Sequence, residues 1–348
     1  MSQNGNNPDS EIRDITIIGA GPVGLITAFW AGMREASSRI IDSLPDLGGQ
    51  LTTLYPEKWI YDVPGHPRIR ARELVARHRE QTLGQFDVPV HLSTTADRIS
   101  HRDDGVVLHT DRGELRSRAV IVAGGHGAFE PRRLTDLDVT PWLGRGAHEV
   151  LADAAQLAGR RVLVVGGGDS ALDRVLDLLG VAERVGLVHR RERFRAHEIT
   201  VRRVLDAAAE GRLDLHVPYR VGAVRGNGTV EGVTLRHADD SATAVDVPAD
   251  AIVLQLGFRT TLGPLAGWGF ELDRGAIRVD PLMATSLDRV WACGDVTSFA
   301  GKLKLIATGY AEAAIAVSQV LLRIRPQTTL QPGYSTNTGV PGAVEGQP

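Results

Sequence analysis

A glycine motif near the N-terminus limits what this chain can fold into. In DITIIGAGPVGLITAFWAGM, a short run of β-branched residues leads into Gly19, Gly21 and Gly24, and a helical pattern follows. The next predicted strand, SRIIDSL, ends near Asp42. A strand, a glycine loop, a helix, a second strand and an acid in this order are typical of a dinucleotide-binding βαβ unit. An ordinary glycine-rich turn is the weaker alternative, because it does not explain the flanking pattern.

The same pattern occurs again in the middle of the chain. RRVLVVGGGDSALDRVLDLLG carries a GxGxxA motif that starts at Gly166, and the strand RVGLVHRR follows it. Asp42 lies 23 positions after Gly19 (42 − 19), and His189 lies 23 positions after Gly166 (189 − 166). The two motifs are therefore in the same register. One has an acid at the ribose position, and the other has a histidine followed by arginines.

The similarity between the two halves continues after each motif. Short predicted strands separated by tight turns follow both motifs, and each series ends in an apolar strand with glycine at its exit. We therefore predict an α/β fold with two Rossmann-like, three-layer ββα dinucleotide-binding domains. The second is expected to be inserted in the first, because the late strand LDRVWACGDV still needs a sheet to join. The expected parts are a mobile N-terminal arm at residues 1–11, a first domain at 12–127 and 258–325, a second domain at 128–257, and a C-terminal tail at 326–348.

Opposite charges at the two ribose positions predict different nucleotides. Asp42 can accept hydrogen bonds from a ribose diol and would repel a 2′-phosphate, which suits FAD or NAD in the first domain. Arg190, Arg191 and Arg195 offer planar charged groups that suit the 2′-phosphate of NADPH in the second domain. His189 is expected only to pack beside the adenine. The alternative is a solvated basic face or a nucleic-acid patch, which the net charge of −3 makes less favourable.

Two nucleotides in one chain predict electron transfer between them. Asp295, in the strand-end motif ACGDV, can bond the ribitol of a flavin, although helix capping is the default interpretation of such an acid. Cys293 is the only cysteine, so an intrachain disulfide and a cysteine-ligated metal site are not expected. The N-terminal residues lack the apolar core of a signal peptide, and no apolar run approaches the roughly 20 residues of a membrane span. We therefore expect a cytoplasmic protein without a membrane or nucleic-acid partner.

The motifs together resemble a known family. GAGPVGLITAFWAGMR, SLPDLGGQLTTLYPEKWIYDVPG, GGGDSALD, HRRERFRAHE, ACGDV and KLKLIATGYAEAAIAV are similar to those of ferredoxin–NADP(+) reductases of the thioredoxin-reductase-like type, within the pyridine nucleotide-disulfide oxidoreductase superfamily. The resemblance extends from about residue 14 to residue 336. It implies a homodimeric FAD protein that transfers electrons between NADPH and ferredoxin or flavodoxin.

The resemblance also implies which residues bind the cofactors. The residues expected to bind FAD are Gly19, Gly21, Gly24, Asp42, Gln50, Tyr55, Ala96 (through its backbone), Phe129, Asp295, Ser335 and Thr336. The residues expected to bind NADPH are Gly166, Gly168, Asp169, Ser170, His189, Arg190, Arg191 and Arg195. Tyr55 and Tyr334 are expected to stack on the two faces of the flavin, with the start of the tail covering it. The family often has Glu in place of Asp42, and His or Phe in place of Tyr334.

The implied reaction needs no acid–base residue. Hydride passes from the nicotinamide to flavin N5, and single electrons then pass to the carrier, so no catalytic side chain is expected. A thioredoxin reductase is the nearest rival, but that activity needs a CxxC pair, which this chain lacks. An NADPH-dependent quinone or flavin reductase and a non-catalytic NADPH-sensing flavoprotein stay open. Ferredoxins are usually acidic, so basic residues near the flavin are candidates for the docking surface: Arg68, Arg70, Arg72, Arg132 and Arg133.

Overall fold

The chain divides into two compact units. The computed structural model describes residues 11–341 except 126, 150, 152 and 241, so the expected N-terminal arm and the end of the tail lie almost entirely outside the described residues. One unit comprises the residues up to 128 and from 260, and the other comprises residues 129–259. The α/β fold class predicted from the two glycine motifs is confirmed.

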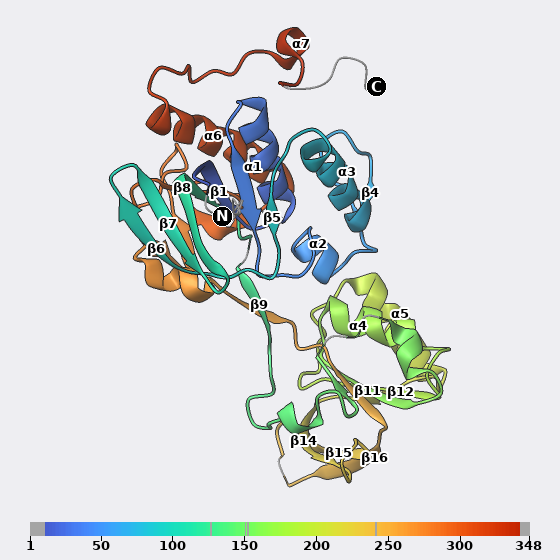
Figure 1. Ribbon diagram of the computed structural model, residues 1–348. Helices are drawn as coiled ribbons and strands as arrows, with labels where there is room; N and C mark the ends of the chain where they lie inside the picture. Colours follow the sequence, from blue (N-terminus) through green and yellow to red (C-terminus); the bar gives the residue numbers. More distant parts are fainter. Residues whose placement is uncertain (1–10, 126, 150, 152, 241, 342–348) are drawn as a thin grey trace, which may run out of the picture. The chain divides into compact units, whose positions relative to one another are not determined.

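The first unit is built on a seven-stranded sheet (Figure 1). Its strand order is β5-β2-β1-β8-β7-β6, and β21 pairs with β8. Around β1 the pairing is parallel, while β6, β7 and β8 form an antiparallel meander. The strands are β1 (Arg13–Ile18), β2 (Ser38–Ile41), β5 (Val90–His91), β6 (Ala96–Arg102), β7 (Gly105–Thr110), β8 (Gly113–Val122) and β21 (Val290–Ala292).

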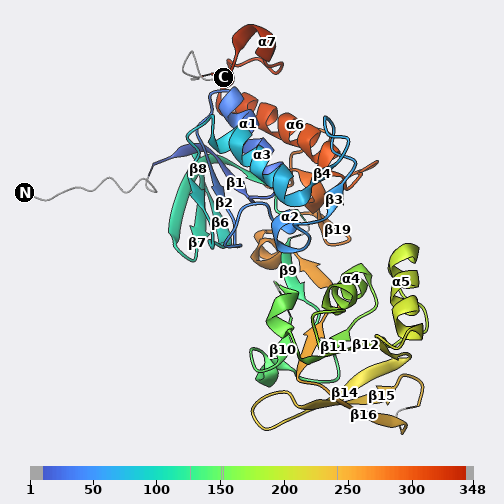
Figure 2. The ribbon, with the colours of Figure 1, turned by 90° about the vertical axis from the view of Figure 1, so that its right-hand side faces the viewer.

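Helices accompany this sheet, and one of them begins directly after the first glycine loop. The helices are α1 (Pro22–Met33), α2 (Gln50–Thr53), α3 (Ala71–Leu83), α6 (Ile306–Ile324) and α7 (Ser335–Thr338). Pro22 is the first residue of α1, where its fixed φ and missing N–H are tolerated. Helix α1 packs against both α3 and α6 (Figure 2). Smaller pieces are β3 (Trp59–Ile60) with β4 (Ile69–Arg70), and β19 (Leu272–Asp273) with β20 (Ala276–Arg278) and β22 (Thr297–Ser298).

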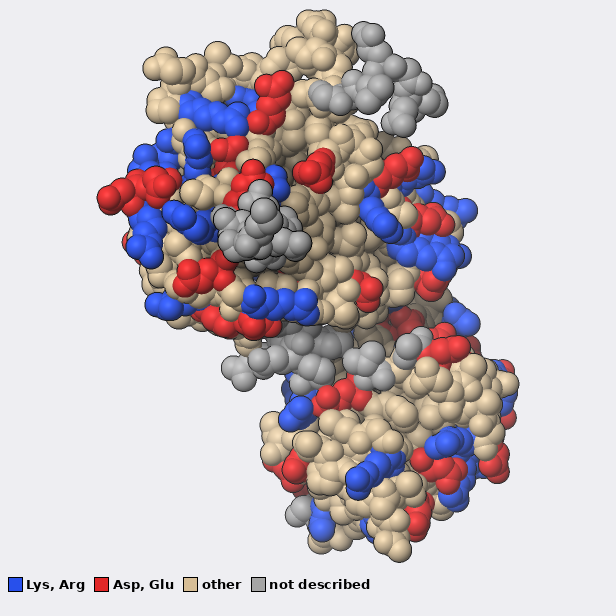
Figure 3. Space-filling view, in the orientation of Figure 1, with Lys and Arg blue, Asp and Glu red and all other residues tan. Residues whose placement is uncertain are grey.

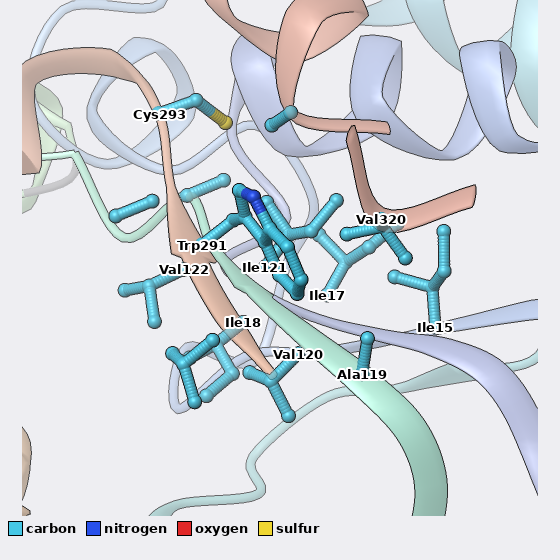
Figure 4. Close-up of a cluster of buried hydrophobic side chains, with 14 of the residues drawn as sticks. Ile15, Ile17, Ile18, Ala119, Val120, Ile121, Val122, Trp291, Cys293 and Val320 are labelled. Carbon is cyan, nitrogen blue, oxygen red and sulfur yellow. The ribbon is translucent and has the colours of Figure 1, made fainter. Parts of the chain in front are cut away.

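The core of the first unit explains why β1 is central. Ile15 and Ile17 of β1 are fully buried, as is Ile121 of β8. Ile17 pairs with Ile40 on one side and with Ile121 on the other. Such continuous apolar runs are typical of parallel strands that are covered on both faces. Figure 4 shows these side chains packed with Trp291 of β21 and with Val320 of α6.

The second unit repeats the plan on a smaller scale. A five-stranded parallel sheet has the order β10-β17-β11-β12-β13, and a three-stranded antiparallel sheet β14-β15-β16 accompanies it. The elements are β10 (Ala147–His148), β11 (Arg161–Val165), α4 (Asp169–Leu178), β12 (Arg184–Val188), α5 (Glu198–Ala209), β13 (Asp214–His216), β14 (Tyr219–Arg225), β15 (Gly232–His237), β16 (Ala244–Pro248) and β17 (Ala251–Leu254). The chain crosses between the units through the paired strands β9 (Ala128–Pro131) and β18 (Phe258–Thr261).

The two meanders differ in one respect that the sequence pattern does not reveal. In the first unit, the ten-residue strand β8 is continuous, and it pairs with β7 through its first half and with β1 through its second half. In the second unit, the corresponding segment is divided by Ala249 and Asp250 into β16, which joins the small sheet, and β17, which joins the parallel sheet. Both series return the chain to the glycine loop of their own unit.

Candidate functional site

The first glycine loop has two glycines fixed by packing and one that faces open space. Gly19 has a φ of +113°, and a Cβ there would lie 2.4 Å from the carbonyl oxygen of Ala123. A Cβ on Gly24 would lie 1.8 Å from the carbonyl oxygen of Gly19. A Cβ on Gly21, by contrast, would meet no heavy atom within 4 Å. The loop thus presents its backbone openly at Gly21, at the N-terminus of α1, where a pyrophosphate can approach.

Asp42 lies against this loop, as its position after β2 predicts. One carboxylate oxygen accepts a hydrogen bond from the amide of Ala20 at 2.6 Å, and the other accepts one from the amide of Leu44 at 2.8 Å. Burial raises the pKa of Asp42, and these two hydrogen bonds counter that rise. The carboxylate is therefore held beside the glycine loop, in the position expected for an acid that binds the ribose.

The GGQ segment packs over the same loop. The amide of Gly48 donates to the carbonyl oxygen of Ala20 at 2.9 Å. A Cβ on Gly49 would lie 3.3 Å from the Cα of Gly21, so these two backbones approach closely. Gln50, the first residue of α2, places its side-chain nitrogen 3.3 Å from where a Cβ on Gly125 would stand. Gln50 therefore lies near the end of β8, among the residues expected to bind the flavin nucleotide.

Tyr55 and Asp295 come together although 240 positions separate them (295 − 55). Asp295 follows β21, and a Cβ on the preceding Gly294 would lie 3.3 Å from Val23 in the first turn of α1. Tyr55 is half-buried, and burial and then the charge of Asp295 raise the pKa of its phenol. The structure thus brings Asp295, Tyr55 and the glycine loop to one end of the parallel strands, the usual ligand position in such folds.

Other residues expected at the flavin are less closely gathered. Ala96 is the first residue of β6 and is buried. Phe129 lies in β9, and its side chain is outside the described part of the structure.

The C-terminal residues lie elsewhere in the first unit. The guanidinium of Arg34, at the C-terminal end of α1, donates to the carbonyl oxygens of Thr329 at 2.6 Å and Leu330 at 3.2 Å. The tail therefore leaves from the end of α1 opposite the glycine loop, and α7 lies at that end in Figure 1. Tyr334 is 71% exposed there, and Ser335 and Thr336 are also exposed. The structure does not bring these residues to Tyr55, and their contact with a flavin stays a prediction.

The second glycine loop has the same geometry as the first. Gly166 has a φ of +157°, and a Cβ there would lie 2.2 Å from the carbonyl oxygen of Gln255. The nearest heavy atom to a Cβ on Gly168 would be 3.9 Å away, so this glycine is also open. Ala171, which stands where the first motif has Gly24, is fully buried. Ser170 is exposed in the first turn of α4.

The basic segment folds back onto this second loop. The amide of Arg195 donates to the carbonyl oxygen of Gly167 at 2.7 Å. The amide of His197 donates to the carboxylate of Asp169 at 2.9 Å, so Asp169 positions the segment as well as beginning α4. The sequence does not reveal this tether, because it joins residues 28 positions apart. The cations that the sequence placed at the ribose position are thereby held beside the open Gly168.

His189 packs against the second glycine loop in this arrangement. Its ring stacks on Phe194 with centroids 5.3 Å apart, and it lies over Gly167, where a Cβ would be 2.3 Å from the imidazole. Burial lowers the pKa of His189, and the nearby arginines lower it further, while a contact with the carbonyl of Arg193 acts in the opposite sense. An imidazole stacked in this way fits the expectation that His189 packs beside the adenine.

The arginines of the basic segment are accessible to a ligand. Arg190, Arg191 and Arg195 are exposed. Within the described residues, no carboxylate forms an ion pair with any of the three. Unpaired guanidinium groups beside an open glycine loop are well suited to a phosphate monoester.

Cys293 is a buried thiol. It is fully buried, and burial raises the pKa of its thiol to about 12. As the only cysteine of the chain, it has no partner for an internal dithiol.

Among the described residues, no three His, Cys, Asp or Glu side chains are grouped so that they could hold a metal ion. In the same part of the chain, no helix combines the length and apolar character needed to cross a membrane.

Comparison with known proteins shows to which family this chain belongs. Residues 13–319 match the pyridine nucleotide-disulphide oxidoreductase family. A protein of Thermus thermophilus named ferredoxin–NADP reductase is 42% identical over 330 residues, covering 94% of this chain and 98% of that protein. A protein of Listeria monocytogenes named ferredoxin–NADP reductase 2 is 43% identical over 330 residues, again covering 94% and 98%.

Solved structures show the same fold. Thioredoxin reductase of Lactococcus lactis matches with a TM-score of 0.71 and 23% identity, covering 90% of this chain and 99% of that one. Bacillithiol disulfide reductase of Staphylococcus aureus matches with a TM-score of 0.74 and 14% identity, covering 90% and 99%. At these identities the likeness concerns the fold, which has two Rossmann-like domains, and not the reaction.

Proposed function

The chain belongs to the pyridine nucleotide-disulphide oxidoreductase family, and from that premise we propose that it is a flavin-dependent ferredoxin–NADP(+) reductase, which transfers electrons between NADPH and ferredoxin or flavodoxin. Full-length relatives that carry this name support the activity. The single buried cysteine argues against the disulfide reduction performed by proteins of the same fold.

The observation that carries the proposal is the contrast between the two glycine loops. Asp42 is hydrogen-bonded beside the first loop, and unpaired arginines stand beside the second. An acid accepts hydrogen bonds from a ribose diol, whereas arginines bind a 2′-phosphate. One chain therefore has a site suited to FAD and another suited to NADPH.

The residues of the first unit fit FAD. The open backbone at Gly21 would accept the pyrophosphate at the N-terminus of α1, and Asp42 would bind the ribose. Asp295 would bond the ribitol, and Tyr55 would lie against the ring. When bound, the flavin would supply the chemistry that accepts one hydride, with its two electrons, and passes these electrons on singly.

The residues of the second unit fit NADPH. The amides at Gly168 and the start of α4 would bind the pyrophosphate, and Arg190, Arg191 and Arg195 would bind the 2′-phosphate. Asp169 holds the basic segment in place through His197. We assign no acid or base to the hydride step, so this chain's contribution is to bind and orient its cofactors. A homodimer in the cytoplasm is part of the same proposal.

Steady-state assays with purified, FAD-supplemented protein test the function. We expect NADPH to reduce ferricyanide and ferredoxin or flavodoxin, and NADH to be a poor donor. Fast ferricyanide reduction with no transfer to any protein carrier would instead favour a quinone or flavin reductase. A colourless protein that takes up no FAD would overturn the proposal.

A further inference from the structure

Large apolar side chains are exposed in two short segments of the first unit. Trp59 and Tyr61, around β3, are 39% and 66% exposed. Leu303 and Leu305, just before α6, are 58% and 41% exposed. Exposed apolar residues that gather on one part of a surface are typical of an interaction site, whereas scattered ones are not.

The two segments adjoin the same small core. Ile60 and Ile306 are both partly buried and pack against one cluster, which includes Leu74 of α3. The exposed residues beside Ile60 and those beside Ile306 therefore belong to one region of the first unit. We call this region, with Trp59, Tyr61, Arg68, Arg70, Leu303, Lys304 and Leu305, the aromatic–arginine surface.

Arginines hold the indole of Trp59 in place. The guanidinium carbons of Arg68 and Arg70 lie 4.6 Å and 4.7 Å from the centroid of its ring. Arg70 is also the strand partner of Trp59 in the β3–β4 pair. A rigid aromatic ring flanked by guanidinium groups loses little conformational entropy on binding, and Trp and Arg are enriched where interfaces gain most of their energy.

The surface has cations available to a partner. Arg70 and Arg72 both form ion pairs with Glu57, at 2.8 Å and 2.5 Å. For Arg68 and Lys304, no ion pair with a described carboxylate exists. Figure 3 shows Lys and Arg side chains gathered over α3 and β4, with acidic side chains between them. The excess of unpaired positive charge favours a partner that carries negative charge.

The surface begins at the residue expected to lie against the flavin. The amide of Lys58 donates to the carbonyl oxygen of Tyr55 at 3.1 Å, which closes a turn between Tyr55 and Trp59. The amide of Arg72 donates to the carbonyl oxygen of Pro56 at 3.0 Å, so the start of α3, directly after β4, is tied to the same turn. Tyr55 itself packs against the core that supports the surface.

We propose that the aromatic–arginine surface is the docking site of the electron carrier, a small acidic protein that accepts one electron at a time. The inference rests on the proposed function, because it uses Tyr55 as the residue beside the flavin. Transient electron-transfer complexes have small interfaces with an apolar centre and a charged rim, and this surface has both features. A second copy of this chain is the competing occupant, and the experiment below distinguishes the two.

The experiment compares Trp59→Ala and Arg68→Glu with the control Arg112→Glu, an exposed residue in the turn between β7 and β8. Each FAD-loaded variant is assayed with saturating NADPH, once with a plant-type acidic ferredoxin and once with ferricyanide. We expect Trp59→Ala and Arg68→Glu to raise the KM for ferredoxin roughly tenfold, and Arg68→Glu to flatten its salt dependence. Ferricyanide reduction by all variants, and both activities of Arg112→Glu, should equal those of the wild type.

Three results would overturn the inference. A KM for ferredoxin that is unchanged in both variants would show that the carrier docks elsewhere. A fall in oligomeric state on gel filtration of Trp59→Ala or Arg68→Glu would show that a second copy covers this surface. A wild-type protein that reduces ferricyanide but no ferredoxin would overturn the proposed function itself, and the docking site would fall with it. This result is seen without any variant, so it is distinguishable from the first two.

Discussion

The ammonium of Lys302 donates hydrogen bonds to both carboxylate oxygens of Glu312, at 2.5 Å and 2.7 Å, and the two side chains are only 7% and 6% exposed. The same carboxylate accepts a hydrogen bond from the amide of Gly294 at 2.7 Å. Because Gly294 directly precedes Asp295, this buried pair fixes the loop that carries an expected flavin ligand. A carboxylate and an ammonium are stable in such a position only while each neutralises the other.

Breaking this pair should destabilise the protein strongly. Glu312→Gln or Lys302→Met leaves one buried charge without its partner, which typically costs about 3–5 kcal/mol. Thermal unfolding should show a lower Tm for each single variant and weaker retention of FAD. The double variant removes both charges, so its loss should be smaller than the sum of the single losses. Single variants with the wild-type Tm would contradict this account.

Two glycines of the first loop should respond oppositely to alanine. Gly24→Ala places a methyl group 1.8 Å from the carbonyl oxygen of Gly19, so the loop must move and the fold should lose stability. Gly21→Ala meets no atom within 4 Å and should keep the Tm of the protein without FAD. It should nevertheless weaken FAD binding by tenfold or more, because the methyl group would stand where the pyrophosphate approaches. Equal FAD affinity in Gly21→Ala and wild type, measured by fluorescence titration, would show that the pyrophosphate lies elsewhere.

The local parts of this site are predictable from the sequence. The βαβ pattern and the spacing from Gly19 to Asp42 place the carboxylate beside its loop, because both depend on short-range geometry. The second motif places the arginines in the same way.

Contacts between distant residues are not predictable in this way. The pairing of Lys302 with Glu312 joins a loop to a helix, and the sequence shows only a lysine and a glutamate of unknown burial. Tyr334 is a similar case, because its position follows from the hydrogen bonds of Arg34 to the tail. Nothing in the residues around Tyr334 signals those contacts.

Loss of the arginines should change the choice between NADPH and NADH. Arg190→Ala combined with Arg191→Ala removes two charge-assisted contacts of about 1.5–3 kcal/mol each to the 2′-phosphate. The KM for NADPH should therefore rise by about two to four powers of ten, while that for NADH changes little. Arg212→Ala, an exposed arginine of the same unit that pairs with Glu210, serves as the control. An equal change in both KM values would mean that these arginines do not bind the phosphate.

His78 should make stability depend on acid pH. It is buried in α3, where its imidazole contacts the hydroxyl of Tyr310, and burial lowers its pKa to about 4. Since the unfolded imidazole titrates near pH 6.5, the unfolded state binds a proton that the folded state excludes between pH 6.5 and pH 4. The contribution of His78 to the free energy of unfolding should be fully present above pH 6.5. It should fall by roughly 3 kcal/mol as the pH decreases to 4. Urea unfolding at several pH values should show that His78→Phe lacks this part of the slope, and an identical slope in the variant would assign the effect to other groups.

Tyr334 offers a test of the tail. If its ring stacks on the flavin, Tyr334→Ser should leave FAD bound but change the visible absorbance of the flavin and its accessibility to oxidants. Tyr55→Ser should change the same spectrum, because Tyr55 is the residue expected to stack on the other face of the flavin. Tyr61→Ser, which removes another exposed tyrosine, should leave the spectrum unchanged. Since Tyr334 is 71% exposed at the end of α1 opposite the glycine loop, a spectral change would require the tail to leave the position that Arg34 gives it. An unchanged spectrum and turnover rate would show that Tyr334 belongs to the tail alone and that Tyr55 is the aromatic residue at the flavin.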